Sequence, residues 1–159
     1  MSFVTDYLAD RELEFTAYNH QRAYTSIEEA RALGIHADEV IKAIVLDTSV
    51  GHALAVIPAA DRVDMHRVRE ATGDPHAKLA DEHEIQIDLP TFELGAVPPL
   101  GTLVEMAIYV DPVVSEHDYV VFASGKQTES VRMHSKDLLS DPHVKILPLR
   151  ATTGSKLTA

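Results

Sequence analysis

The residues best suited to bind an anion or a carbonyl group form one stretch, in which two glycines and two prolines stand among apolar side chains. The seven residues are Gly95, Ala96, Val97, Pro98, Pro99, Leu100 and Gly101. Each proline fixes φ and removes a backbone donor, whereas each glycine lets a ligand approach the main chain. We expect a stiff, partly buried loop that presents free N–H groups to an anion or oxyanion. The alternative is a rigid corner between a helix and a strand, because Gly and Pro occur in loops of every kind.

Lys42 is the second candidate, since it stands inside the apolar run of residues 40–46. A charged ammonium in a strand covered on both faces is costly unless it is paired or wetted by a cleft. In a cleft, this lysine would bind a phosphate or a carboxylate. A lysine near a strand end whose side chain simply reaches solvent is the alternative.

Two further segments each allow a functional and a structural interpretation. Asp111 precedes Pro112 at the end of an apolar strand, where it would orient a group in a cleft or begin a turn. Ser124 and Gly125 lie where a strand enters a glycine turn. Their hydroxyl and N–H groups would contact a ligand or close a hairpin.

The sequence contains no nucleophile elbow, Walker loop or dinucleotide fingerprint. Its nine histidines are scattered, and the densest spot, residues 82–84, is interpreted as a solvated helix face rather than a metal site. The sequence therefore offers no cofactor-binding motif, and no cofactor is expected.

Composition excludes several classes of protein. With 14 basic and 25 acidic residues the net charge is −11, so a broad basic surface for duplex nucleic acid is excluded and no DNA partner is expected. Any RNA contact should be local, such as a single-stranded end in a pocket. The absence of cysteine excludes disulfides and thiolate nucleophiles. No apolar run could cross a bilayer and residues 1–10 do not resemble a signal peptide, so we expect no membrane partner and a cytoplasmic location.

The 159 residues, of which 45% are hydrophobic, predict a single domain over residues 1–150 with a flexible tail at 151–159. Apolar periodicity and capping signals predict helices over residues 1–12, 25–34, 64–72, 80–85 and 134–139. Strands are predicted over residues 14–18, 40–46, 53–58, 103–110, 119–123, 130–133 and 144–147, the second and third of these as an antiparallel hairpin. The predicted fold class is α+β, a compact mixed, largely antiparallel β-sheet with surrounding helices.

Taken in order, several segments resemble the YbaK/ProX family of aminoacyl-tRNA editing domains. They are Tyr24-Thr25, residues 40–46, 53–59 and 62–64, Leu79-Ala80 with Glu84, residues 93–101 and 109–111, and Ser124-Gly125. The resemblance covers about residues 15 to 148. Two positions depart from it: many relatives have Thr where this chain has Ala43, and Ser where it has Pro98.

The resemblance implies a pocket for the aminoacylated 3′ end of tRNA and metal-independent hydrolysis of the ester that joins a wrong amino acid to it. The substrate would be a small amino acid on tRNA for proline or cysteine, and the substrate's own ribose hydroxyl would help to position or activate water. By position, the catalytic residues would be Lys42, Gly95 and Gly101. The substrate-binding residues would be Thr25, Ala96, Val97, Pro98, Pro99, Asp111, Ser124 and Gly125. An aminoacyl-tRNA synthetase is a further implied partner.

Two other functions remain open at this point. One is a non-catalytic module of the same fold that binds a nucleotide, a tRNA or a synthetase. The other is an unrelated hydrolase that uses the scattered His and Asp residues with a metal.

Overall fold

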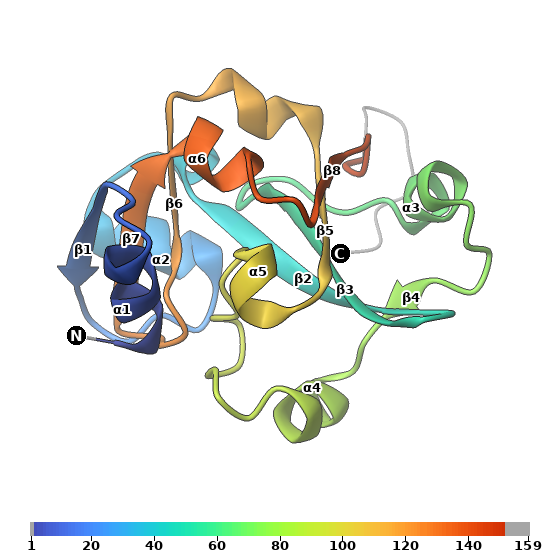
Figure 1. Ribbon diagram of the computed structural model, residues 1–159, viewed down its shortest axis with the longest axis horizontal. Helices are drawn as coiled ribbons and strands as arrows, with labels where there is room; N and C mark the ends of the chain where they lie inside the picture. Colours follow the sequence, from blue (N-terminus) through green and yellow to red (C-terminus); the bar gives the residue numbers. More distant parts are fainter. Residues whose placement is uncertain (1, 152–159) are drawn as a thin grey trace.

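The computed structural model describes residues 2–151 and arranges them in two β-sheets with helices around them (Figure 1). A three-stranded antiparallel sheet has the order β1–β7–β6, formed by β1 (Phe15–Asn19), β7 (Glu129–His134) and β6 (Tyr119–Ala123). A five-stranded sheet has the order β4–β2–β3–β5–β8, formed by β4 (Lys78–Leu79), β2 (Ile41–Thr48), β3 (Gly51–Pro58), β5 (Ala107–Val110) and β8 (Val144–Ile146). The β3–β5 and β5–β8 pairs are parallel and the others antiparallel. The predicted α+β class is confirmed, with the strands divided between two sheets.

The β2–β3 hairpin leaves part of the outer edge of β2 without a partner strand. The N–H of Ala59 donates to the carbonyl of Val40 at 2.7 Å, and this register directs the backbone groups of Ala43 and Val45 away from β3. The Val45 carbonyl accepts from Ala80 at 3.0 Å, and β4 pairs only with the far end of β2. Within residues 2–151, no strand pairs with β2 at Ala43.

In the described part of the chain, residues 2–151, six α-helices and two 3-10 helices surround the sheets (Figure 1). They are α1 (Phe3–Asp10), α2 (Ser26–Leu33), α3 (Met65–Thr72), α4 (Glu82–Asp88), α5 (Gly101–Val104) and α6 (Ser135–Leu139), with η1 (Ala37–Glu39) and η2 (Pro112–Glu116). Side chains cap the first turns as the sequence indicates: Thr25 caps α2 and Asp64 caps α3. Helix α2 ends at Gly34, whose φ of 70° suits glycine.

Alternation along β2 assigns its side chains to two different cores. Ile41 and Val45 pack into the larger apolar cluster with α1 and the three-stranded sheet, whereas Leu46 belongs to the cluster that α3 covers. Lys42 therefore leaves the sheet on the α3 face, together with Ile44.

One buried carboxyl fixes α2 on the three-stranded sheet. The hydroxyl of Ser130 donates to Glu29, and the Ser130 hydroxyl also contacts Nε2 of His20 at 2.8 Å. Glu29 is buried, and burial raises its pKa to about 7, although the Ser130 hydrogen bond opposes the rise. At the start of α2, Thr25 accepts from the Glu28 N–H and donates its hydroxyl to the Glu28 carboxylate, which leaves Glu29 free for the contact with Ser130.

The strand predicted over residues 103–110 is wrong in its first half. The chain forms α5 up to Val104 and then turns at Glu105, whose φ of 55° lies in the left-handed region, before β5 begins at Ala107. Apolar periodicity does not separate such a short buried helix from a strand.

Of the predicted tail, residues 152–159 lie outside the described residues, while the N–H of Ala151 donates to the Arg62 carbonyl at 2.8 Å. None of the described helices is long and apolar enough to span a membrane.

Candidate functional site

A cavity of about 510 Å³ opens beside the unpaired edge of β2, a volume within the usual range for small-molecule sites. The start of α2, the outer edge of β2, the segment from β4 into α4, and the glycine-proline loop form its wall. The lining residues are Tyr24, Thr25, Ala43, Ile44, Val45, Leu79, Ala80, Glu82, Ile85, Leu94, Gly95, Val97 and Gln127. With Gln127, which lies between β6 and β7, the cavity therefore joins five segments that are far apart in the sequence.

The glycine-proline loop, residues 95–101, is as enclosed as its composition predicts, since residues 96–100 are all buried. The N–H of Ala96 donates to the Glu93 carbonyl at 3.0 Å, and the two prolines have no N–H to donate. The N–H groups of Gly95 and Val97 have no hydrogen-bond partner within the described residues, and both residues line the cavity. Val97 is buried, and buried backbone donors are nearly always paired, so its open N–H at the cavity wall favours a bound acceptor. Gly95 is exposed and adds a second open donor.

Only glycine fits at position 95. Its φ is +78°, and a Cβ built there would lie 2.9 Å from the carbonyl oxygen of Tyr24. The loop thus lies directly against the start of α2. This contact brings Gly95 and Thr25, two predicted site residues, to the same cavity.

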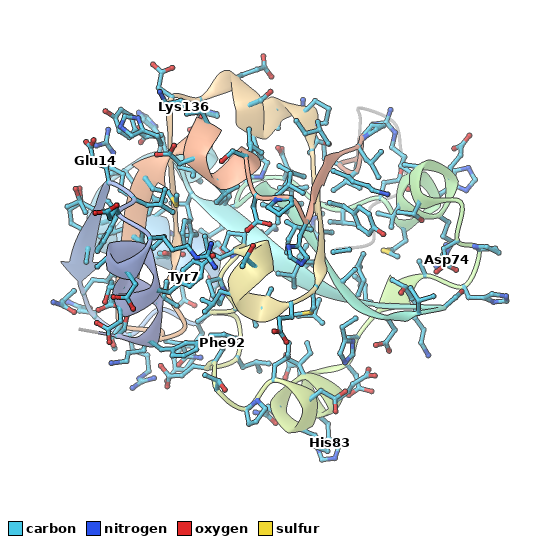
Figure 2. All side chains as sticks on the ribbon, viewed as in Figure 1. Tyr7, Glu14, Asp74, His83, Phe92 and Lys136 are labelled. Atoms are coloured by element: carbon cyan, nitrogen blue, oxygen red, sulfur yellow. The ribbon has the colours of Figure 1, made fainter. Side chains whose placement is uncertain are left out.

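The Gly125 turn holds the loop through the backbone. The N–H of Gly125 donates to the Ala96 carbonyl at 2.8 Å, and the Gly125 carbonyl accepts from Glu93 at 2.9 Å. A Cβ at Gly125 would lie 3.1 Å from the ring of Phe92, which stands between the α1 and α4 regions in Figure 2. Gly125 therefore supports the cavity wall from behind and is not among the lining residues.

Gln127 adds a second clamp that sequence reasoning missed. Its side-chain amide donates to the Leu94 carbonyl at 2.8 Å, and its backbone N–H donates to Glu93 at 2.8 Å. Arg22 donates to the Gln127 side-chain oxygen at 2.8 Å and to Glu93 at 3.1 Å. Neither composition nor spacing marks this glutamine, because its role depends on a contact between residues 33 positions apart.

Lys42 is not among the lining residues, and its side chain leaves β2 on the α3 face, whereas Val45 and Val97 of the cavity wall belong to the cluster on the other face. Ala43 and Ile44, which follow it on β2, both line the wall. Burial lowers the pKa of Lys42, the positive charge of Arg62 lowers it further, and Asp61 opposes both effects. The ammonium is thus half-buried beside one like and one unlike charge, an environment that a bound anion would improve.

Thr25 lines the cavity with its hydroxyl already engaged. The oxygen accepts from the Glu28 N–H at 3.1 Å, and the hydroxyl donates to the Glu28 carboxylate at 3.2 Å. Its N-cap role fixes the start of α2 against the loop.

Asp111 follows the structural alternative that the sequence allowed. It is buried away from the cavity and begins η2 by accepting from Val113 at 3.0 Å. Its other carboxylate oxygen accepts from Leu149 at 2.9 Å and from Arg150 at 3.0 Å. These bonds fix the C-terminal segment, and nothing observed supports the predicted substrate contact.

The remaining predicted residues are structural in their contacts. The hydroxyl of Ser124 is buried and donates to Glu129 at 2.5 Å. A Cβ at Gly101 would collide with Cβ of His143, so this glycine serves the close packing of α5. Ala96, Pro98 and Pro99 form the buried back of the loop rather than the cavity surface.

Comparison with known proteins shows the family of this chain. Residues 20–140 match the aminoacyl-tRNA editing domain family. The chain therefore belongs to this family, also called the YbaK family, as the sequence resemblance predicted.

Solved structures share the fold at low sequence identity. One crystallised hypothetical protein superposes with a TM-score of 0.83 and 21% identity, over 93% of this chain and 99% of its own. A candidate trans-editing enzyme for prolyl tRNA synthetase superposes with a TM-score of 0.78 and 23% identity, over 94% and 95% of the two chains. At these identities the likeness establishes the fold alone.

Proposed function

We propose that this protein is a deacylase that hydrolyses the ester bond of mischarged aminoacyl-tRNA, with the aminoacylated 3′ end seated in the cavity beside β2. One observation carries the proposal: exposed Gly95 and buried Val97 both line the cavity, and the backbone N–H of each has no hydrogen-bond partner within residues 2–151. Such donors stabilise the negative charge that develops on an ester carbonyl during attack by water. Because the loop is held by its own prolines and by the Gly125 turn, little reorganisation accompanies the reaction.

The cavity wall suits a small aminoacyl group. Ala43, Val45, Ile85 and Val97 supply apolar surface. The outward-facing N–H and C=O of Ala43 are positioned to bind polar atoms of the substrate. We propose a small amino acid on tRNA for proline or cysteine, although one methylene changes selectivity by only about 1–3 kcal/mol.

No protein nucleophile is needed. Glu82 and Tyr24 are the titratable side chains among the lining residues, and no serine or histidine stands beside them in that lining. We propose that water attacks the ester carbon, helped by the ribose hydroxyl of the substrate, while the loop N–H groups bind the carbonyl oxygen. The ester C–O bond then breaks, and a proton passes to the departing ribose oxygen.

Lys42 is proposed to bind the phosphate of the terminal nucleotide at the edge of the cavity. Its half-buried charge would gain an anionic partner there. The net charge of −11 leaves little basic surface elsewhere, so we expect modest, salt-sensitive tRNA affinity, supplemented by a synthetase. Tight filter binding of tRNA at high salt would contradict this expectation.

The test is a deacylation screen against a panel of mischarged tRNAs, with and without chelator. We expect hydrolysis of at least one small aminoacyl ester that survives chelator, and a large loss in Lys42→Ala. Lys136→Ala, which removes an exposed lysine on α6, serves as the control and should keep the wild-type rate.

Two outcomes would point elsewhere. Binding of tRNA without hydrolysis of any ester would indicate a non-catalytic module of the same fold. Activity that survives Lys42→Ala and disappears with chelator would indicate a metal hydrolase.

A further inference from the structure

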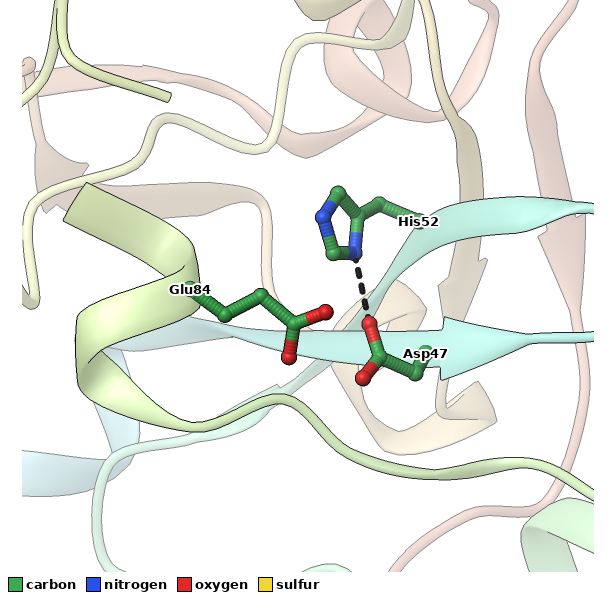
Figure 3. A group of neighbouring side chains, drawn as sticks. All are labelled: Asp47, His52 and Glu84. Atoms are coloured by element: carbon green, nitrogen blue, oxygen red, sulfur yellow. Dashed lines mark ion pairs between the residues drawn. The ribbon is translucent and has the colours of Figure 1, made fainter. Parts of the chain in front are cut away.

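Three potential metal-ligating side chains meet on the outer part of the β2–β3 hairpin. Asp47 comes from β2, His52 from β3 and Glu84 from α4, and one potential ligand atom of each lies within 4.8 Å of the others (Figure 3). All three side chains are partly buried, with His52 only 17% exposed. The cluster is separate from the lining of the proposed reaction cavity.

The histidine ring is held in one orientation. Its Nε2 lies 2.8 Å from a carboxylate oxygen of Asp88, the last residue of α4, and its Nδ1 lies 2.9 Å from Asp47. Figure 3 shows Nδ1 directed at Asp47, with the Glu84 carboxylate beside it. A carboxylate on the far nitrogen is the arrangement that orients metal-bound histidines in proteins.

The carboxylates in this cluster also lie close to each other. One carboxylate oxygen of Glu84 lies within 4.8 Å of one of Asp47, so two acidic groups face the same small space. Within residues 2–151, no lysine or arginine forms an ion pair with Asp47, Glu84 or Asp88. Among these described residues, the imidazole of His52 is the single basic group at the centre of the three carboxylates.

We propose that Asp47, His52 and Glu84 bind one Zn²⁺ ion. One imidazole nitrogen and two carboxylate oxygens are ligands that zinc accepts in tetrahedral sites, and water would complete the shell. Ligand atoms in such a site lie about 3.3 Å apart, as zinc–ligand bonds of about 2 Å require. The ligand atoms must therefore approach by a short distance, which rotation of the long Glu84 side chain allows.

The proposed ion would fix α4. This helix supplies Ile85 and Glu82 to the wall of the reaction cavity. It also supplies Glu84 to the cluster, and Asp88 to the contact that orients His52. Zinc would tie the helix to the β2–β3 hairpin and take no part in ester hydrolysis. The proposal stands on this geometry alone and does not depend on the proposed function.

Residues 82–84 are predicted from the sequence to form a solvated helix face. His83 fits that interpretation, since it points outward from α4 in Figure 2. Glu84 does not fit that interpretation, because the fold brings it beside Asp47 and His52, which lie more than about 30 positions earlier in the sequence.

The test is calorimetric titration of the chelator-treated, dialysed full chain with ZnCl₂, and with MgCl₂ for comparison. We expect one Zn²⁺ site that Mg²⁺ does not fill. Glu84→Gln and His52→Gln should each weaken it at least about tenfold, whereas His83→Gln, the matched control on the same helix, should not.

Hydrogen exchange provides a readout that a variant with altered folding cannot imitate. Zn²⁺ should slow amide exchange over residues 82–88 in the wild-type chain and in His83→Gln, but not in Glu84→Gln. Zinc binding of equal strength in all variants, or no binding to the wild-type chain, would overturn the proposal. Deacylation is not measured in either experiment, so failure of the proposed function leaves the result unaffected.

Discussion

Replacing Gly95 by alanine should damage both stability and activity, in amounts that the structure allows to be separated. The residue has φ +78°, so the left-handed conformation costs an L-residue about 1–2 kcal/mol. The new Cβ would also lie 2.9 Å from the Tyr24 carbonyl oxygen, a backbone atom that cannot rotate away. We expect a loss of about 2–4 kcal/mol in the free energy of unfolding once the displacement of the loop is included.

Gly73→Ala is the matched control, because Gly73 has φ +70° and a Cβ added there would meet no atom within 4 Å. Urea denaturation gives the loss in the free energy of unfolding for each variant. The loss in Gly73→Ala reports the cost of the backbone conformation, and the extra loss in Gly95→Ala reports the contact with Tyr24. Deacylation should fall in Gly95→Ala, since the Gly95 and Val97 N–H groups move, and stay at the wild-type rate in Gly73→Ala. Equal stability losses together with unchanged deacylation in Gly95→Ala would refute the role given to this loop.

Three other predictions concern Lys42, Ala43 and Glu29. Lys42→Ala should raise KM for mischarged tRNA far more than Lys136→Ala does, and equal KM values in steady-state assays would argue against a phosphate contact. Ala43→Leu should narrow the cavity and slow deacylation while urea denaturation shows nearly unchanged stability; an unaltered rate would place the substrate elsewhere. Because burial raises the pKa of Glu29 from 4.5 to about 7, the folded chain binds more protons than the unfolded chain between these two values. The free energy of unfolding should therefore fall by about 2–3 kcal/mol between about pH 5 and about pH 8 because of this group. Glu29→Gln should remove that pH dependence, which denaturation at a series of pH values would show.

Much of the fold follows from local sequence signals. The apolar run that contains Lys42 forms β2, and the turn at Gly51 closes the predicted antiparallel hairpin. Helix α2 begins at the Thr25 cap and ends at Gly34, as side-chain capping and the glycine terminator require. These elements are predictable because the deciding contacts lie within a few residues.

The division into two sheets was not predictable in this way. The parallel β3–β5 and β5–β8 pairs depend on long-range packing, and a short helix replaces the first half of a predicted strand. An apolar stretch carries the same pattern in either conformation when all of its faces are buried.

The candidate site was predicted in part. The loop at Gly95 and the cap at Thr25 meet at one cavity. Lys42 precedes two lining residues of β2 without lining the cavity itself, and Asp111 takes the turn-forming role. A helix was predicted over residues 80–85, but its place in the cavity wall was not, and neither was the role of Gln127. Contacts across the fold, rather than residue type or spacing, bring both to the wall.

The central claim is that the N–H groups of Gly95 and Val97 receive the carbonyl oxygen of the substrate. Amide NMR of the ¹⁵N-labelled chain, titrated with a non-hydrolysable 3′-aminoacyl-adenosine analogue, tests it directly. We predict the largest shift changes at the Gly95 and Val97 amides, with little change at Ala96, whose N–H is already bonded to Glu93. Binding of the analogue that leaves both of these amides unmoved would contradict the account.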